Sequence, residues 1–347
     1  MQSFTSLLLR AFYLTLLFAS LLPLFLIVFC SSPTVQSWLI HMHWVNFPFP
    51  FLIDFHQPTK AQFFTNALAC ASYITTNSST PLSGWLISPP SRCPSSPSIP
   101  PSSPPDQRCS SVPPFTHPVL YLHGNAENRA YRPSHARFTF LTAFPLCSDV
   151  FVFDYTGFAD NPGSPTQAGL EEDARAMLNT VVGWDEAITP QSVTVYGHSL
   201  GSAVAIHLLH HLIAHGRPHP HSLIVEGAFT SVIENAMTYL PPPLDRWPWL
   251  TSVVNASLAH PWWSSSHVPL ESEHVRSLFL HGTHDTEIPY WNAGKLWGQV
   301  VERSGCHVQS TTNEDGRVDR CGEDALVTVN KAHHYDVSCA SLPPPSQ

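Results

Sequence analysis

From Pro118 onward, short and continuous apolar runs alternate with segments whose apolar positions recur at helical spacing. The runs lack the in-and-out alternation of half-exposed strands, so they are typical of strands buried on both faces of a parallel sheet. They span residues 119–122, 150–155, 193–196, 223–225, 278–281 and 325–329. The helical segments between them are 169–182, 199–215, 229–240 and 291–301. This order predicts an α/β fold with a mostly parallel sheet, right-handed crossovers and flanking helices.

The region before this alternation contains one further pair of expected strands. Residues 72–75 and 82–88 read as an antiparallel hairpin that opens the sheet. Residues 89–118 are a low-complexity Pro/Ser stretch that cannot bury a core. We interpret it as a long loop inside one domain that spans residues 61–347.

The first thirty residues have a different pattern. Residues 7–30 are apolar apart from Arg10 and a few small polar residues, which is long enough for a transmembrane helix. A cleavable signal peptide is the alternative. Arg10 is the only charge on the amino side, and no Lys or Arg follows until Lys60. The positive-inside rule then predicts that residues 1–30 form a short cytosolic tip and a transmembrane anchor. The rest of the chain is expected on the luminal or extracellular side.

The next segment, residues 31–60, is rich in Trp, Phe and Pro. Amphipathic aromatic residues collect at membrane interfaces, so the segment is expected to be interfacial. The alternative is an ordinary buried entry into the domain.

Composition narrows the possible functions. Of the 347 residues, 43% are apolar and only 12% are charged, and the formal net charge is -9. Nucleic-acid-binding proteins usually carry a basic excess, so no nucleic-acid partner is expected. The 34 prolines and low charge exclude a coiled coil.

Two further features fit a secretory compartment such as the endoplasmic reticulum. Asn77 and Asn255 each begin an N-glycosylation sequon. Eight cysteines fit an oxidising lumen, and two local disulfides are expected. The pairs are Cys93 with Cys109 and Cys306 with Cys321, although free thiols are the alternative because spacing does not determine connectivity.

Residues 197–201, Gly-His-Ser-Leu-Gly, carry the clearest chemical signal. They follow an expected strand and begin an expected helix, which is the setting of a nucleophile elbow. Small neighbours let the serine backbone turn sharply, and the helix amino terminus favours developing negative charge. We therefore predict that Ser199 is a catalytic nucleophile.

Such a serine needs a base and an acid, in the order Ser, acid, His for this arrangement. Asp285 lies just past an expected strand, and Glu287 is the nearby alternative. His333 and His334 both follow the last expected strand. We choose Asp285 as the acid and His333 as the base.

The oxyanion formed during acyl transfer needs two backbone donors. The N–H of Leu200, directly after the nucleophile, is expected to supply one. The N–H of Asn125 is expected to supply the other, because it lies in the loop after an early strand and follows the turn-permitting Gly124.

These residues resemble the α/β-hydrolase superfamily, and more narrowly its membrane-anchored lysophosphatidylserine and monoacylglycerol lipases. The resemblance runs over residues 47–335 with gaps, and is carried by 49–54 (Phe-Pro-Phe-Leu-Ile-Asp), 120–126 (Leu-Tyr-Leu-His-Gly-Asn-Ala), 153–157, 163–165, 197–201 and 280–289. The family's nucleophile, acid and base fall on Ser199, Asp285 and His333. Residues 240–269, with four tryptophans, lie where such hydrolases insert a small cap.

The resemblance implies a membrane-anchored serine hydrolase that cleaves lipid esters through an acyl-serine intermediate, without a cofactor. The substrate would be a monoacylglycerol or a lysophospholipid such as lysophosphatidylserine. A thioesterase or general carboxylesterase of the same fold is one alternative. A catalytically impaired membrane-tethered binding module is another, because only 14 residues follow His333 and the family's final helix is not expected there.

A helix face with His207, His211 and His215 at four-residue spacing could bind zinc. No acidic or cysteine ligand accompanies these histidines, and the predicted reaction needs no metal. We therefore expect a solvated helix face and no metal site.

Overall fold

The computed structural model describes residues 10, 13, 21, 32–45, 47–58, 70–92, 107–143, 145–239, 252, 255–268 and 275–337. The expected membrane span, residues 7–30, lies outside this set except for three isolated positions. Among the described residues, no helix has the length and apolar character needed to cross a bilayer. Parts of the Pro/Ser loop and of the expected cap also lie outside.

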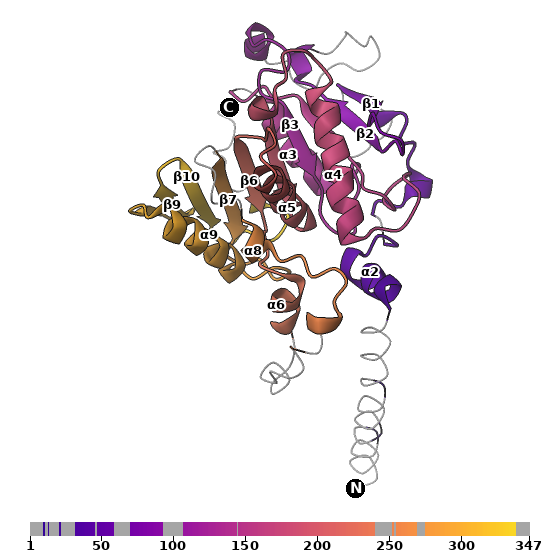
Figure 1. The fold of residues 1–347 in the computed structure, drawn as a ribbon. Helices are drawn as coiled ribbons and strands as arrows, with labels where there is room; N and C mark the ends of the chain where they lie inside the picture. The colour runs from indigo at the N-terminus through magenta and orange to yellow at the C-terminus, as the bar shows by residue number, and fades with distance from the viewer. Residues whose placement is uncertain are drawn as a thin grey trace.

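The described part of the chain forms one ten-stranded sheet in the order β1-β2-β4-β3-β5-β6-β7-β10-β9-β8 (Figure 1). The six strands from β4 to β10 in this order pair in parallel, as the continuous apolar runs predicted, and the edge strands pair antiparallel. The strands are β1 (Ala71–Thr75), β2 (Ser83–Ile87), β3 (Val119–Leu122), β4 (Val150–Phe153), β5 (Thr194–His198), β6 (Ser222–Glu226), β7 (Arg276–Gly282), β8 (Gln309–Asn313), β9 (Gly316–Cys321) and β10 (Asp324–Val329).

Helices cover both faces of the sheet. The α-helices are α2 (Pro33–His41), α3 (Arg132–Thr142), α4 (Gln167–Val182), α5 (Leu200–Ala214), α6 (Val232–Met237), α8 (Ser264–His267) and α9 (Trp291–Ser304). Short 3-10 turns are η1 (Pro50–Leu52), η4 (Pro90–Arg92), η5 (Gln107–Ser111) and η6 (Pro190–Ser192). Figure 1 shows α4 and α5 on the near side of the sheet.

Alternate residues of the central strands enter two different cores. Leu120 and Phe151 pack with residues of α4 and α5 in one cluster, whereas Tyr121 and Val152 pack with Phe138 of α3 in the other. Each of these side chains is fully buried. Burial on both faces explains why the strands are apolar throughout.

One expected disulfide is present and the other is replaced. Cys306 is bonded to Cys321, with a Cα–Cα distance of 5.7 Å. Cys109 is bonded to Cys147 across 38 residues, so the expected pairing of Cys109 with Cys93 is wrong. The turn η5 brings buried Cys109 to the segment between α3 and β4, where Cys147 is also buried. Cys93 itself lies outside the described residues.

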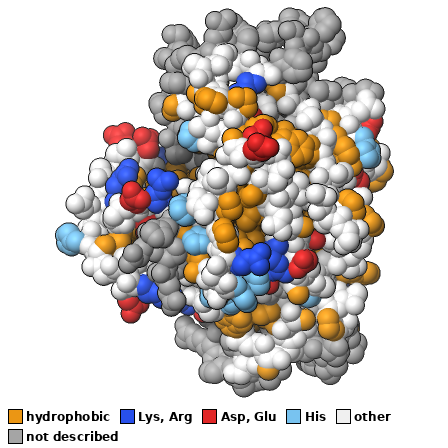
Figure 2. All heavy atoms as spheres, turned by 45° about the horizontal axis from the view of Figure 1, so that its top comes forward, with side chains coloured by type: hydrophobic (Ala, Val, Ile, Leu, Met, Phe, Trp, Pro, Cys, Tyr) orange, Lys and Arg blue, Asp and Glu red, His pale blue; other side chains and the backbone are white. Residues whose placement is uncertain are grey.

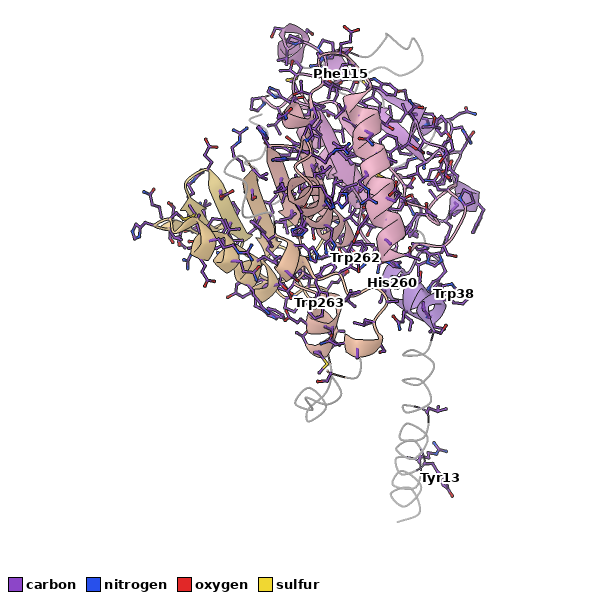
Figure 3. All side chains as sticks on the ribbon, viewed as in Figure 1. Tyr13, Trp38, Phe115, His260, Trp262 and Trp263 are labelled. Carbon is purple, nitrogen blue, oxygen red and sulfur yellow. A yellow bond between two sulfur atoms is a disulfide. The ribbon has the colours of Figure 1, made fainter. Side chains whose placement is uncertain are left out.

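The segment before the hairpin is partly integrated into the domain and partly exposed. Gln36, His41 and Phe55 are buried, and the Phe55 carbonyl accepts a hydrogen bond from the indole of Trp85. The rest of the segment presents an exposed aromatic and aliphatic surface, which we call the apolar collar: Trp38, Leu39, Met42, Trp44, Phe47, Phe49, Phe51 and Leu52. Figure 3 shows Trp38 on the outer side of α2.

Candidate active site

Ser199 occupies the sharp turn between β5 and α5. Its backbone has φ +53° and ψ -118°, a conformation that non-glycine residues rarely adopt. A Cβ atom on Gly197 would lie 2.3 Å from the carbonyl oxygen of Gly201. A Cβ atom on Gly201 would lie 2.0 Å from the carbonyl oxygen of Leu122. Both glycines are therefore required for close packing of the turn, which is the local geometry of a nucleophile elbow.

Asp285 lies in the loop after β7 and is held by the backbone. Its Oδ1 accepts hydrogen bonds from the N–H groups of Glu287 at 2.9 Å and Ile288 at 2.7 Å. Its Oδ2 lies 2.7 Å from Nδ1 of His334. Burial raises the pKa of the Asp285 carboxyl, but the bond to His334 and these backbone donors outweigh it and hold the pKa below the ordinary value. The carboxylate is thus ionised and aimed at an imidazole.

His334, and not His333, is the histidine that meets this carboxylate. His334 is 3% exposed. His333 is exposed, and its backbone N–H donates to the side chain of Asp336. The choice of His333 as the base is therefore corrected, because this tight turn directs the first histidine to solvent and the second into the site.

The electrostatics of His334 suit a base. Burial lowers the pKa of its imidazole, but the hydrogen bond and charge of Asp285 outweigh burial and raise the pKa above the ordinary value. Since Nδ1 donates to the carboxylate, Nε2 is the nitrogen left to accept a proton.

The ends of neighbouring strands bring Ser199 towards His334. The N–H of Ser199 donates to the carbonyl of Glu226 at 2.9 Å, which sets the elbow beside the end of β6. The next residue, Gly227, lies under the imidazole, where a Cβ would come within 2.8 Å of Cε1 of His334. The ends of β5, β6, β7 and β10 therefore converge on one place.

The expected oxyanion loop lies against the elbow. The close approach of Gly201 to Leu122 joins the start of α5 to the end of β3. The Asn125 side chain accepts from the N–H of Ala126 at 2.9 Å and donates to the carbonyl of Ile40 at 2.7 Å. The backbone N–H groups of Asn125 and Leu200 remain the predicted oxyanion donors.

Other sequence-level candidates take different places. Glu287, the alternative acid, accepts a hydrogen bond from the Tyr335 hydroxyl at 3.1 Å, whereas it is Asp285 that meets His334. His207 is buried and pairs with Glu171 at 3.0 Å, so the expected solvated helix face is wrong at this position, where α5 packs against the rest of the protein. No group of three or more side chains that could hold a metal ion occurs in the described ranges.

The two sequons lie in different environments. Asn77 is exposed in the turn between β1 and β2. Asn255 is half-buried and lines a cavity of about 330 Å³. On the face that Figure 2 shows, basic side chains lie beside acidic ones, with no broad basic surface.

Of the four tryptophans in the expected cap, the structure describes Trp262 and Trp263. Trp262 is fully buried and packs edge-on against His41 of α2, at a ring separation of 6.3 Å (Figure 3). Trp263 lines the cavity of about 330 Å³ together with residues of α6 and α9: Ile233, Glu234, Met237, Trp291 and Lys295, with Asn255. The hydroxyl of Tyr239, just past α6, donates to the carbonyl of Thr286 in the Asp285 loop. The α6 segment, part of which lines the cavity, is therefore bonded to the loop that carries Asp285.

Comparison with solved structures decides the fold. An α/β hydrolase from Vibrio vulnificus superposes with a TM-score of 0.58 and 13% identity, over 88% of this chain and 89% of that one. The chain has an α/β-hydrolase fold. No protein-family model matches it.

Two curated relatives carry the same name, lysophosphatidylserine lipase ABHD12. The zebrafish (Danio rerio) protein is 32% identical over 200 residues, which are 54% of this chain and 48% of the relative. The chicken (Gallus gallus) protein is 36% identical over 126 residues, 36% of this chain and 31% of the relative. The matched part of the chain thus spans half or less of the length of these two relatives.

Proposed function

We propose that the protein is a serine hydrolase that cleaves lipid esters. The observation that carries the proposal is the 2.7 Å contact between Asp285 and buried His334, beside a serine held at positive φ. Three strand ends far apart in the sequence supply these groups, in the order that the fold requires.

The reaction follows from this geometry. Nε2 of His334 takes the Ser199 hydroxyl proton as Oγ attacks the ester carbonyl carbon. Asp285 keeps the imidazole oriented and stabilises the imidazolium. The backbone N–H groups of Leu200 and Asn125 receive the oxyanion. When the carbonyl re-forms, the ester C–O bond breaks, and the imidazolium protonates the departing alcohol.

A water molecule then completes the cycle. His334 removes its proton as it attacks the acyl-serine carbonyl. Collapse of the second intermediate returns the proton to Ser199 and releases the fatty acid. No cofactor enters either half-reaction.

The proposed substrate is a monoacylglycerol or a lysophospholipid such as lysophosphatidylserine. The names of the zebrafish and chicken relatives support this class. The cavity beside α6 supports it too, because Trp263, Ile233 and Met237 offer apolar walls to an acyl chain, while Glu234 and Lys295, which are paired with each other, line its polar side.

We further propose that the enzyme works at a bilayer from the luminal side, in the endoplasmic reticulum. The apolar stretch 7–30 ends just before α2. The apolar collar follows, with Trp44 63% and Phe51 82% exposed. Exposed aromatic residues of this kind suit the headgroup region. The helix α2, which carries Trp38 and Leu39 of the collar, and α6 lie at the same end of the molecule (Figure 1).

A fluorophosphonate probe and a lipid panel test the proposal. We expect full-length protein to be labelled, Ser199→Ala to lose labelling, and the exposed-site control Ser304→Ala to keep it. We also expect hydrolysis of monoacylglycerol or lysophosphatidylserine in vesicles. No labelling of folded protein would reject an enzyme, whereas activity on thioesters or short esters alone would reject the lipid substrate.

A further inference from the structure

Five aromatic rings form a continuous row from an exposed tip of the protein to the proposed base. We call them the aromatic row, and in order from the outside they are Phe51, Phe49, Phe47, Tyr131 and Tyr335. The centroids of neighbouring rings are 5.6, 5.7, 6.2 and 5.6 Å apart. The innermost ring, that of Tyr335, packs edge-on against the imidazole of His334 at 4.9 Å. The row therefore connects the apolar collar with the proposed active site.

All five residues of the row are at least partly exposed. Phe51 is 82%, Phe47 48% and Phe49 41% exposed, and the two tyrosines are half-buried. Single exposed apolar residues need no explanation, but a contiguous apolar strip on a protein surface marks an interaction site. Because this strip leads to the proposed base, its occupant is expected to be a ligand of the same site.

The polarity of the row changes along its length. The three outer rings are phenylalanines and carry no polar atom, whereas the two inner rings carry hydroxyls. The hydroxyl of Tyr335 donates to the carboxylate of Glu287 at 3.1 Å. A single-chain lipid has the matching polarity, since its acyl chain is apolar and its ester and glycerol end is polar. Such a lipid fits the row in one direction, with its ester end towards the base.

The middle of the row is held by the backbone beneath it. The N–H of Phe47 donates to the carbonyl of Ala126 at 2.7 Å, and Phe47 forms a parallel bridge with Glu127. The side-chain amide of Asn128 donates to the carbonyl of Pro48 at 2.8 Å. The row is thus fixed against the segment that continues the predicted oxyanion loop, and a ligand does not have to order it.

We propose that the aromatic row is a track along which a single-chain lipid passes from a bilayer surface to Ser199. The exposed Phe51 meets the lipid surface, and the two tyrosines meet the ester end of the lipid. The row acts in delivery, and the cavity beside α6 remains the proposed place of the acyl chain during acyl transfer. This inference rests on the proposed function for the reaction at its inner end.

A polar side chain in the middle of the row tests delivery. Phe47→Ser should lower kcat/KM for a monoacylglycerol in phosphatidylcholine vesicles about tenfold, because it interrupts the apolar strip. Phe47→Leu keeps an apolar side chain and should retain most of this activity. Hydrolysis of a water-soluble short-chain ester should be unchanged in both variants, since that ester needs no delivery. Trp184→Ser, at an exposed aromatic position in the turn after α4, is the control and should change neither reaction.

Two kinetic results contradict the track. Equal losses on the vesicle-borne and the soluble ester in Phe47→Ser would assign Phe47 to support of the oxyanion loop instead. An unchanged kcat/KM for the vesicle-borne lipid in Phe47→Ser would show that the row takes no part in delivery.

A lipid analogue that cannot be hydrolysed tests the row without any activity. The probe is a monoalkylglycerol ether with a diazirine beside its glycerol end, supplied to the full-length chain in phosphatidylcholine vesicles. We expect photolabelling of peptides that contain Tyr131 or Tyr335, reduced in Phe47→Ser and unchanged in Trp184→Ser. Ester hydrolysis without this labelling would overturn the track and leave the proposed function standing. Labelling without hydrolysis of any ester would support the track while the proposed function fails.

Discussion

Adding one methyl group beneath the proposed base is a stringent test of the site. Gly227 has φ +60°, and a Cβ there would lie 2.8 Å from Cε1 of His334. Ordinary contact begins near 3.4 Å, so in Gly227→Ala the imidazole must move by about 0.6 Å or more in a closely packed site. Such a displacement should lower kcat on a soluble ester about 100-fold.

Backbone strain accompanies the displacement and needs its own control. Alanine at positive φ costs about 1 kcal/mol. Gly216 has the same φ of +60°, and a Cβ there would meet nothing within 4 Å. Both variants should lose this backbone contribution in urea unfolding, and Gly227→Ala should lose somewhat more because of its contact with His334, but only Gly227→Ala should lose turnover. Normal turnover in Gly227→Ala, or an equal loss in both variants, would refute the reasoning.

Three further predictions follow from the same geometry. His334→Ala should lower kcat by at least about 1,000-fold. His333→Ala should change kcat less than about twofold, since the His333 side chain is exposed. The reverse order of the two losses in steady-state assays would overturn the assignment of His334 as the base. Met237→Trp should fill the cavity and reduce the hydrolysis of long-chain but not of short-chain esters. Ala236→Trp, at an exposed position, is the control. Equal losses on long-chain and short-chain esters would contradict an acyl chain in this cavity. Burial raises the pKa of the Glu226 carboxyl, but the charge and hydrogen bonds of Arg137 outweigh burial, and the pKa falls to about 2. The ionised carboxylate therefore stabilises the folded state by about 3 kcal/mol. This stabilisation is complete above pH 4.5 and is lost as the pH falls from 4.5 to 2. Urea unfolding should show a smaller decrease across that window in Glu226→Gln, and an equal decrease would exclude this group as a cause.

The parallel strands were predictable to within one or two residues because they are buried on both faces. Their apolar runs are too short for helices and alternate with longer segments of helical spacing, which favours buried strands. The helix α3 was not predicted, because its buried face is partly polar. Ser134, His135 and Arg137 all point into the protein, and Arg137 is there to pair with Glu226. Polar side chains that are buried and paired within the protein interrupt the apolar spacing by which a helix is predicted from the sequence.

The antiparallel strands β8 and β9 were missed for the opposite reason. Every residue of the edge strand β8 is exposed, so its sequence has no apolar pattern from which a strand could be predicted. The pairing of Cys109 with Cys147 was equally hidden, since it depends on where η5 meets the chain before β4. Spacing along the chain carries no information on such a long-range contact.

The places of the proposed nucleophile and acid could be predicted because strand ends position them, although their catalytic roles remain proposals. A parallel sheet delivers the carboxyl ends of its strands to one edge, so the order of the elements was enough. The choice between His333 and His334 depends on one residue of register in a tight turn. The bond from the His333 N–H to Asp336 decides that register, and adjacent histidines offer no pattern that distinguishes them.

The segment before the hairpin changes how the site should be understood. The Ile40 carbonyl accepts from the Asn125 side chain, so α2 helps to hold the oxyanion loop. The side chain of Gln36 donates to the carbonyl of Ser257 at 2.7 Å and accepts from the N–H of Ala259 at 2.6 Å, so α2 also holds the base of the cap. The same helix carries exposed Trp38 on its outer side (Figure 3). One short helix therefore carries an exposed tryptophan and also contacts both the predicted oxyanion loop and the expected cap segment. If the proposed membrane contact occurs at this helix, it has a direct physical route to the proposed site.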